Sequence, residues 1–131
     1  MASTRRTYTI EEANALLPEV RAVLLQLAVQ HHHRQQAHEE LHDLLVGNRA
    51  EAVAEREARL EREIEELEAN IRSLLGHLAS LDVQVRDLEM GLVDFPGLRD
   101  GRPVWLCWRL SDPRVAHWHG TDEGFANRRP W

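Results

Sequence analysis

The amino-acid sequence predicts an α+β fold, in which a short leading helix and a long antiparallel helical hairpin pack on a small C-terminal antiparallel β-meander. Three observations predict it. Apolar residues recur with helical spacing through the first ninety positions, six of the seven aromatic residues come after them, and Gly, Pro and Asp turn signals separate the later segments. We expect one domain over residues 1–131, with the hairpin in residues 8–81 and the meander and C-terminal segment in residues 82–131.

The helical part begins with a capping box, because Thr9 is followed three positions later by an acidic residue, Glu12. Pro18 interrupts the helical stretch, since the residue before a proline disfavours the α conformation. We therefore expect a short helix over residues 10–16, a bend, and a long helix over residues 18–46. The glycine and asparagine that follow are typical of a helix end and a helix start, so they would form the tip of the hairpin.

The second long helix carries apolar residues at alternating spacings of four and three positions, which is the seam that packs helices as a coiled coil. These residues are Leu60, Ile64, Leu67, Ile71, Leu74, Leu78 and Leu81. The matching seam of the first helix is apolar at both ends but polar in its middle, at His31, Arg34 and His38. Either these three side chains lie at an edge and pair with glutamates such as Glu68, or the hairpin opens there.

The predicted helices are much longer than the predicted strands. A helix over residues 18–46 is about 43 Å long, whereas strands of five to eight residues reach only about 17 to 27 Å. The sheet therefore cannot cover the whole hairpin, and a bare pair of helices is not stable alone. We expect a homodimer that forms through the helices.

The sheet part is predicted from short runs of β-branched and aromatic residues between turn signals. We expect three or four strands, around residues 83–85, 91–95, 103–110 and 115–119. A turn through Ser111-Asp112-Pro113-Arg114 would set Trp108 opposite His117 and Leu106 opposite His119.

Composition excludes several classes of function. The 16 basic residues, all Arg, are outnumbered by 22 acidic ones, and the net charge of -6 argues against a nucleic-acid partner. A single Cys excludes a disulfide framework and is typical of a reducing compartment. With no signal peptide or membrane span, we expect a cytoplasmic protein without a membrane partner. Residues 94–129 are nevertheless locally basic, which leaves room for a small anionic ligand.

The run His38-Glu39-Glu40-Leu41-His42 matches the motif H-E-x-x-H. On a helix, His38 and His42 lie one turn apart and can share a zinc ion, with Glu39 as the general base of a zinc-dependent hydrolase. A third ligand would have to come from Glu57, Glu61 or elsewhere. The competing interpretation is a solvated or dimer-facing helix that is rich in histidine.

A second candidate site lies in the sheet part, where His117 and His119 alternate and therefore share one face of a strand. Together with Asp122 they are candidate ligands of a divalent transition metal such as zinc. The wider set of candidate ligand-binding residues is Asp94, Cys107, Arg109, His119 and Arg128. Two alternatives remain: Arg–Asp pairs that lock the C-terminal segment, and a Cys107–His119 pair that acts as a nucleophile.

Several motifs occur together along the chain: Tyr8-Thr9-Ile10-Glu11-Glu12-Ala13-Asn14, Leu17-Pro18, Gly91-Leu92-Val93-Asp94-Phe95-Pro96, Leu106-Cys107-Trp108-Arg109, Trp118-His119, Gly124-Phe125-Ala126 and Arg128. With these motifs the chain resembles, over essentially its whole length, a family of small bacterial proteins catalogued as domain of unknown function 2203. The resemblance implies no catalytic role, and it directs attention to the sheet part rather than to the H-E-x-x-H run. We therefore predict a dimeric binding or interaction protein; the alternatives are a zinc-dependent hydrolase and a coiled-coil adapter.

Overall fold

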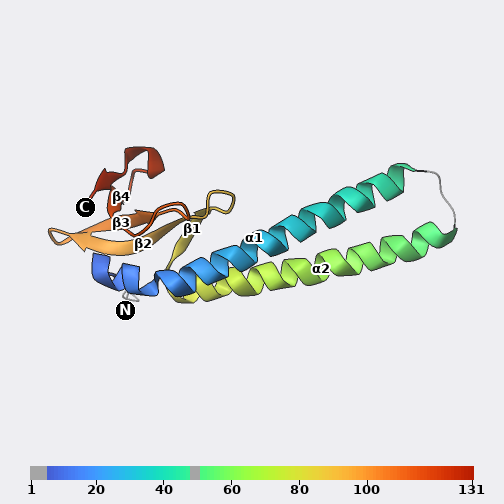
Figure 1. The fold of residues 1–131 in the computed structure, drawn as a ribbon, viewed down its shortest axis with the longest axis horizontal. Coiled ribbons are helices and arrows are strands. Elements are labelled where there is room, and N and C mark those ends of the chain that lie inside the picture. Colours follow the sequence, from blue (N-terminus) through green and yellow to red (C-terminus); the bar gives the residue numbers. More distant parts are fainter. Residues whose placement is uncertain (1–5, 48–50) are drawn as a thin grey trace.

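The structure, a computed structural model, describes residues 6–47 and 51–131. Two long helices, α1 (Ile10–Val46) and α2 (Glu51–Ser80), form an antiparallel hairpin, and a five-stranded antiparallel sheet packs at one end of it (Figure 1). The strands are β1 (Gln84–Asp87), β2 (Leu92–Arg99), β3 (Arg102–Trp108), β4 (His117–Gly120) and β5 (Arg129–Pro130). The predicted α+β class is confirmed, and Asn48 at the predicted tip lies outside the described residues.

The capping box at the start of α1 is confirmed. The side chain of Thr9 accepts a hydrogen bond from the backbone N–H of Glu12 (3.1 Å), and the Glu12 carboxylate accepts one from the backbone N–H of Thr9 (2.9 Å). The prediction of two helices separated at Pro18 is wrong, because α1 runs unbroken for 37 residues with Pro18 inside it. Figure 1 shows only a change of axis direction near the N-terminal end.

Tertiary packing explains why the helix continues through Pro18. Ala13, Leu17 and Val20, on both sides of the proline, are buried in the main core. The side-chain amide of Asn14 also anchors this turn, since it donates to the carbonyl oxygen of Val115 (3.0 Å) and accepts from its N–H (2.8 Å). These contacts outweigh the one helical hydrogen bond that a proline removes.

The predicted seam of α2 is largely buried, and at the outer end of the hairpin it packs on a small residue of α1. Leu60 and Ile64 form a separate cluster with Ala37 there. His38 is exposed and approaches Glu68, with 4.0 Å between its Nε2 and the carboxylate. His38 thus lies beside a glutamate, as the first of the two interpretations predicted, whereas Arg34 and His31 are half-buried and hydrogen-bond each other (2.9 Å).

The five strands form a meander in which each strand pairs with the next. The predicted pairing of the third and fourth strands is wrong by one residue: Cys107 lies opposite His117, and Leu106 lies opposite Trp118. The strands are joined by an eight-residue connection, residues 109–116, rather than by a four-residue turn. Asp112 holds this connection, because its carbonyl oxygen accepts from Trp108 Nε1 (3.0 Å) and its carboxylate from the N–H of Arg109 (3.1 Å).

This register decides which side chains share a face of the sheet. The inner face carries Val93, Phe95, Leu106 and Trp108, which are fully buried in the core shared with the helices. The side chains of the alternate residues in the same strands lie on the outer face. The C-terminal segment covers this face (Figure 1). The fifth strand, β5, which was not predicted, belongs to that segment and pairs with β4. No helix of the described residues combines the length and the apolar composition needed to cross a membrane.

Candidate metal centre

Three strands bring an Asp, a Cys and a His together on the outer face of the sheet. Asp94 lies on β2 directly opposite Cys107 on β3, and His119 lies on the neighbouring strand β4. All three side chains are buried, and one potential donor atom from each lies within 4.8 Å of the other two. Within the described part of the chain, this is the one group of three metal-ligating side chains that converges in this way.

Both ring nitrogens of His119 face atoms that accept hydrogen bonds. Nδ1 lies 2.9 Å from the carbonyl oxygen of Gly120, and Nε2 lies 3.1 Å from each carboxylate oxygen of Asp94. Because a carbonyl only accepts, Nδ1 carries a proton. Nε2 then faces the carboxylate with its lone pair unless a second proton or a metal ion lies between them.

Arg86 completes the surroundings of Asp94, and sequence reasoning missed it. Its Nε donates to Oδ2 of Asp94 (2.9 Å), and its guanidinium carbon lies 4.9 Å from the ring centroid of Trp105. Arg86 occupies the irregular position of β1, between Val85 and Asp87. With Asp94 and His119 it lines a cavity of about 310 Å³. The contact of Arg86 with Asp94 follows from the pairing of β1 with β2, which the sequence alone does not reveal. The one available sequence signal was the alternation of residues in the strand predicted around residues 83–85.

Cys107 is a protonated thiol at physiological pH. Burial, followed by the negative charge of Asp94, raises its pKa to about 12, although the nearby Arg128 favours the thiolate. An activated nucleophile needs a depressed pKa and a free base beside it, but both ring nitrogens of His119 are directed to Gly120 and Asp94. The geometry therefore does not support a Cys–His nucleophile. A metal ion would change this, because it displaces the thiol proton on binding.

The two predicted arginines serve the C-terminal segment. Arg128 donates to Asp112 (2.7 Å), and Arg109 forms a longer ion pair with the same carboxylate (3.6 Å). Both guanidinium groups also lie over the ring of Phe125, at 4.5 and 5.1 Å from its centroid. These contacts support the interpretation that Arg–Asp pairing locks the segment onto the sheet.

Two of the predicted metal ligands lie outside the converging group. His117 is half-buried opposite Cys107, and its Nδ1 is buried without a hydrogen-bond partner. Asp122 is exposed in the loop after β4. On α1, His38 and His42 are exposed around an open hollow, and no third donor among the described residues joins them within 4.8 Å.

Residues 6–131 match a family described as "Uncharacterized conserved protein (DUF2203)". The chain belongs to the DUF2203 family. No curated protein and no solved structure matches it. In this DUF2203 protein the late motifs, which carried the resemblance, supply Asp94, Cys107 and His119, whereas the H-E-x-x-H run lies apart on α1.

Proposed function

We propose that this DUF2203 protein binds a zinc ion between Asp94, Cys107 and His119. One observation carries the proposal: Nε2 of His119 faces the Asp94 carboxylate while Nδ1 is committed to the carbonyl oxygen of Gly120. Metal-binding histidines commonly donate their second N–H to a carbonyl in this manner, because that bond fixes the tautomer and the ring orientation. A thiolate, an imidazole and a carboxylate together suit zinc among the common divalent ions.

The surroundings support a site with a free coordination position. Three protein ligands leave zinc one position short of its usual four, and such sites bind water or a ligand there. The cavity of about 310 Å³ adjoins Asp94 and His119 and provides space for this ligand. Arg86 borders the same cavity and holds the Asp94 carboxylate in place. The proposed function is therefore a zinc-dependent binding protein.

Zinc content tests the proposal. Protein purified without a His-tag should contain one zinc per chain, or take up one on reconstitution, and His119→Gln should lose it. His117→Gln is the matched control, since His117 lies on the same strand and face but outside the group. The variant His38→Gln should also retain the metal. Loss of zinc in His38→Gln, with zinc retained in His119→Gln, would instead favour the site at the H-E-x-x-H motif.

Cobalt substitution provides a second measurement that separates metal binding from folding. The cobalt-loaded parent should show thiolate-to-cobalt charge-transfer absorption, which Cys107→Ser should lose while its far-UV circular dichroism stays that of the parent. A parent that takes up neither zinc nor cobalt stoichiometrically would contradict the proposal, and the buried Asp–His pair would then be a structural ion pair.

We also propose that the protein is a homodimer that forms through the helices. Leu25 and Val29, one turn apart on α1, are 50% and 51% exposed. A 37-residue helix is about 55 Å long, and the sheet packs at one end of the hairpin only (Figure 1). The exposed pair of apolar side chains supports a helix–helix contact with a second copy.

The dimer is tested by sedimentation equilibrium. We expect the parent to sediment as a dimer, and the double variant Leu25→Glu, Val29→Glu to sediment as a monomer with unchanged helicity, because both side chains are on the surface of one chain. Gln36→Glu is the control, since it adds a negative charge at another exposed position of α1 and should remain dimeric. A monomeric parent would show the proposal to be wrong.

A further inference from the structure

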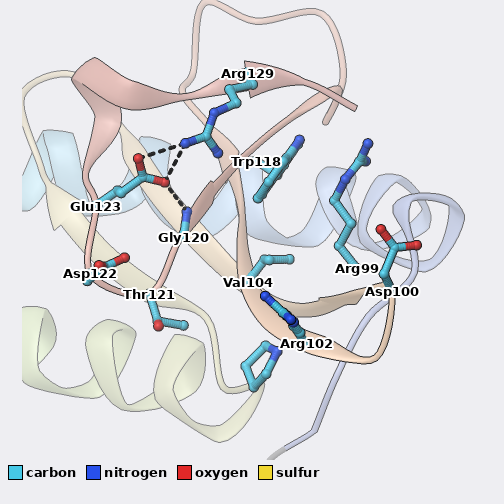
Figure 2. Close-up of a pocket in the computed structure, with 11 residues that line it drawn as sticks. Arg99, Asp100, Arg102, Val104, Trp118, Gly120, Thr121, Asp122, Glu123 and Arg129 are labelled. Atoms are coloured by element: carbon cyan, nitrogen blue, oxygen red, sulfur yellow. Dashed lines mark hydrogen bonds and ion pairs between the residues drawn. The ribbon is translucent and has the colours of Figure 1, made fainter.

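A second cavity, of about 780 Å³, lies at the end of the sheet where the β2–β3 turn, the loop after β4 and strand β5 meet. Figure 2 shows its lining. Three arginines surround it, namely Arg99, Arg102 and Arg129, together with Trp118 and the acidic side chains of the loop after β4. None of the three arginines belongs to the candidate metal centre.

Two of these arginines are held in place by stacking. The guanidinium carbons of Arg99 and Arg129 lie 4.8 and 4.7 Å from the ring centroid of Trp118, and Figure 2 shows the indole between them. Arg99 also lies 4.8 Å from the centroid of Trp131 and donates to the carbonyl oxygen of that residue (3.1 Å). Stacking uses the face of a guanidinium and leaves its N–H edge available for a carboxylate or phosphate.

Three acidic residues of the lining, Asp100, Asp122 and Glu123, balance the three arginines in number, but only one of these arginines forms an ion pair with them. Arg129 forms two hydrogen bonds with Glu123, at 2.7 and 2.9 Å, so its charge is compensated. The backbone N–H of Gly120 has the largest effect on the pKa of Glu123 and lowers it; burial opposes this, and Arg129 adds to it, so that the pKa stays below its ordinary value. Among the ion pairs of residues 6–47 and 51–131, none includes Arg99 or Arg102.

We propose that this cavity binds a small polar organic anion, whose carboxylate or phosphate group is held by Arg102, with Arg99 as a second positive group elsewhere in the lining. The positive charge of Arg102 is not compensated by an ion pair with any of the described residues. The guanidinium of Arg99 is already held in its orientation by two indole rings. The carboxylates of Asp100 and Asp122 also line the cavity, where they accept hydrogen bonds from hydroxyl or amino groups of the same ligand. A simple inorganic anion leaves these acceptors without a partner and binds more weakly.

The cavity adjoins the one at the metal centre, because Thr121 and Glu123 line both. A ligand anchored at Arg102 therefore extends along the loop after β4 toward Asp94 and His119. The anion site does not depend on the zinc proposal, since its own residues and charges carry it.

Calorimetric titration of the full chain tests the inference with three probes of one skeleton: glycerol phosphate, glycerate and glycerol. We expect the parent to bind at least one of the two anions and not glycerol, and the comparison of phosphate with carboxylate identifies the anionic group. Arg102→Gln should weaken that binding about tenfold or more, because it removes a charge-assisted hydrogen bond from an exposed side chain without affecting the fold. Arg114→Gln, an exposed arginine outside the cavity, should bind as the parent does.

Three results would overturn the inference: no binding of either anion by the parent, equal binding of glycerol, or equal affinity of the parent and Arg102→Gln. Repeating the titration with the zinc-free His119→Gln variant separates the two proposals. Anion binding that persists in this variant supports a site independent of the metal, whereas anion binding that disappears with the metal assigns the anion to the centre instead.

Discussion

Replacing Trp108 by alanine should destabilise the protein by about 3–5 kcal/mol, a large part of the total stability of a domain of this size. Trp108 is fully buried at the end of β3 and packs in the core shared by the sheet and the helices. Its indole N–H also donates to the carbonyl oxygen of Asp112, and the guanidinium of Arg21 lies 5.1 Å from the ring centroid. The truncation therefore creates a cavity and also releases the connection that sets the register of β4.

Urea denaturation followed by far-UV circular dichroism measures this effect, and two variants separate its causes. Trp108→Phe keeps most of the ring but removes the N–H, so we expect it to lose about 1 kcal/mol. Trp131→Ala removes a tryptophan that is 45% exposed and should have a much smaller effect than Trp108→Ala. If Trp108→Ala were as stable as Trp131→Ala, the core assignment of Trp108 would be wrong.

The helical hairpin was predictable because its signals are local. The capping box at Thr9 is contained in four consecutive residues, and the seam from Leu60 onward repeats within single helical turns. Pro18 shows the limit of such reasoning. Its local preference is to end a helix, but contacts of Asn14 with Val115, about a hundred residues later in the chain, favour continuation.

The candidate centre was only partly predictable, for a related reason. Alternation along β4 correctly places His117 and His119 on one face, but the identity of their neighbours depends on the register. That register is set by the pairing of β4 with β3 across an eight-residue connection, which no pattern within β4 reveals. The sequence names His117, His119 and Asp122 as candidate metal ligands and includes Asp94, Cys107 and His119 in the wider ligand-binding set. The structure brings these last three together.

Asp112→Asn should destabilise the protein by about 1.5–3 kcal/mol at neutral pH, because it leaves the mostly buried Arg128 without its anionic partner. Burial opposes ionisation of Asp112, but hydrogen bonds from Arg128 and from the N–H of Arg109, with the charges of both arginines, outweigh it and lower the pKa of Asp112 below the ordinary 3.8. A carboxyl with a depressed folded-state pKa stabilises the fold above its unfolded-state pKa. This stabilisation is lost as the pH falls through the lower, folded-state value.

The difference in unfolding free energy between parent and Asp112→Asn should therefore be constant from pH ~7 to ~5 and shrink progressively below pH ~4. Urea titrations across this range measure it. Asp100→Asn is the matched control: Asp100 sits in the β2–β3 turn at a φ of 52°, which asparagine tolerates, and no ion pair among the described residues includes it. The difference in unfolding free energy between the parent and Asp100→Asn should not shrink in this way as the pH falls. If the difference for Asp112→Asn stayed constant down to pH ~2, the Asp112 side chain would contribute by shape and neutral hydrogen bonding. Its charge would then not hold the C-terminal segment over the outer face of the sheet.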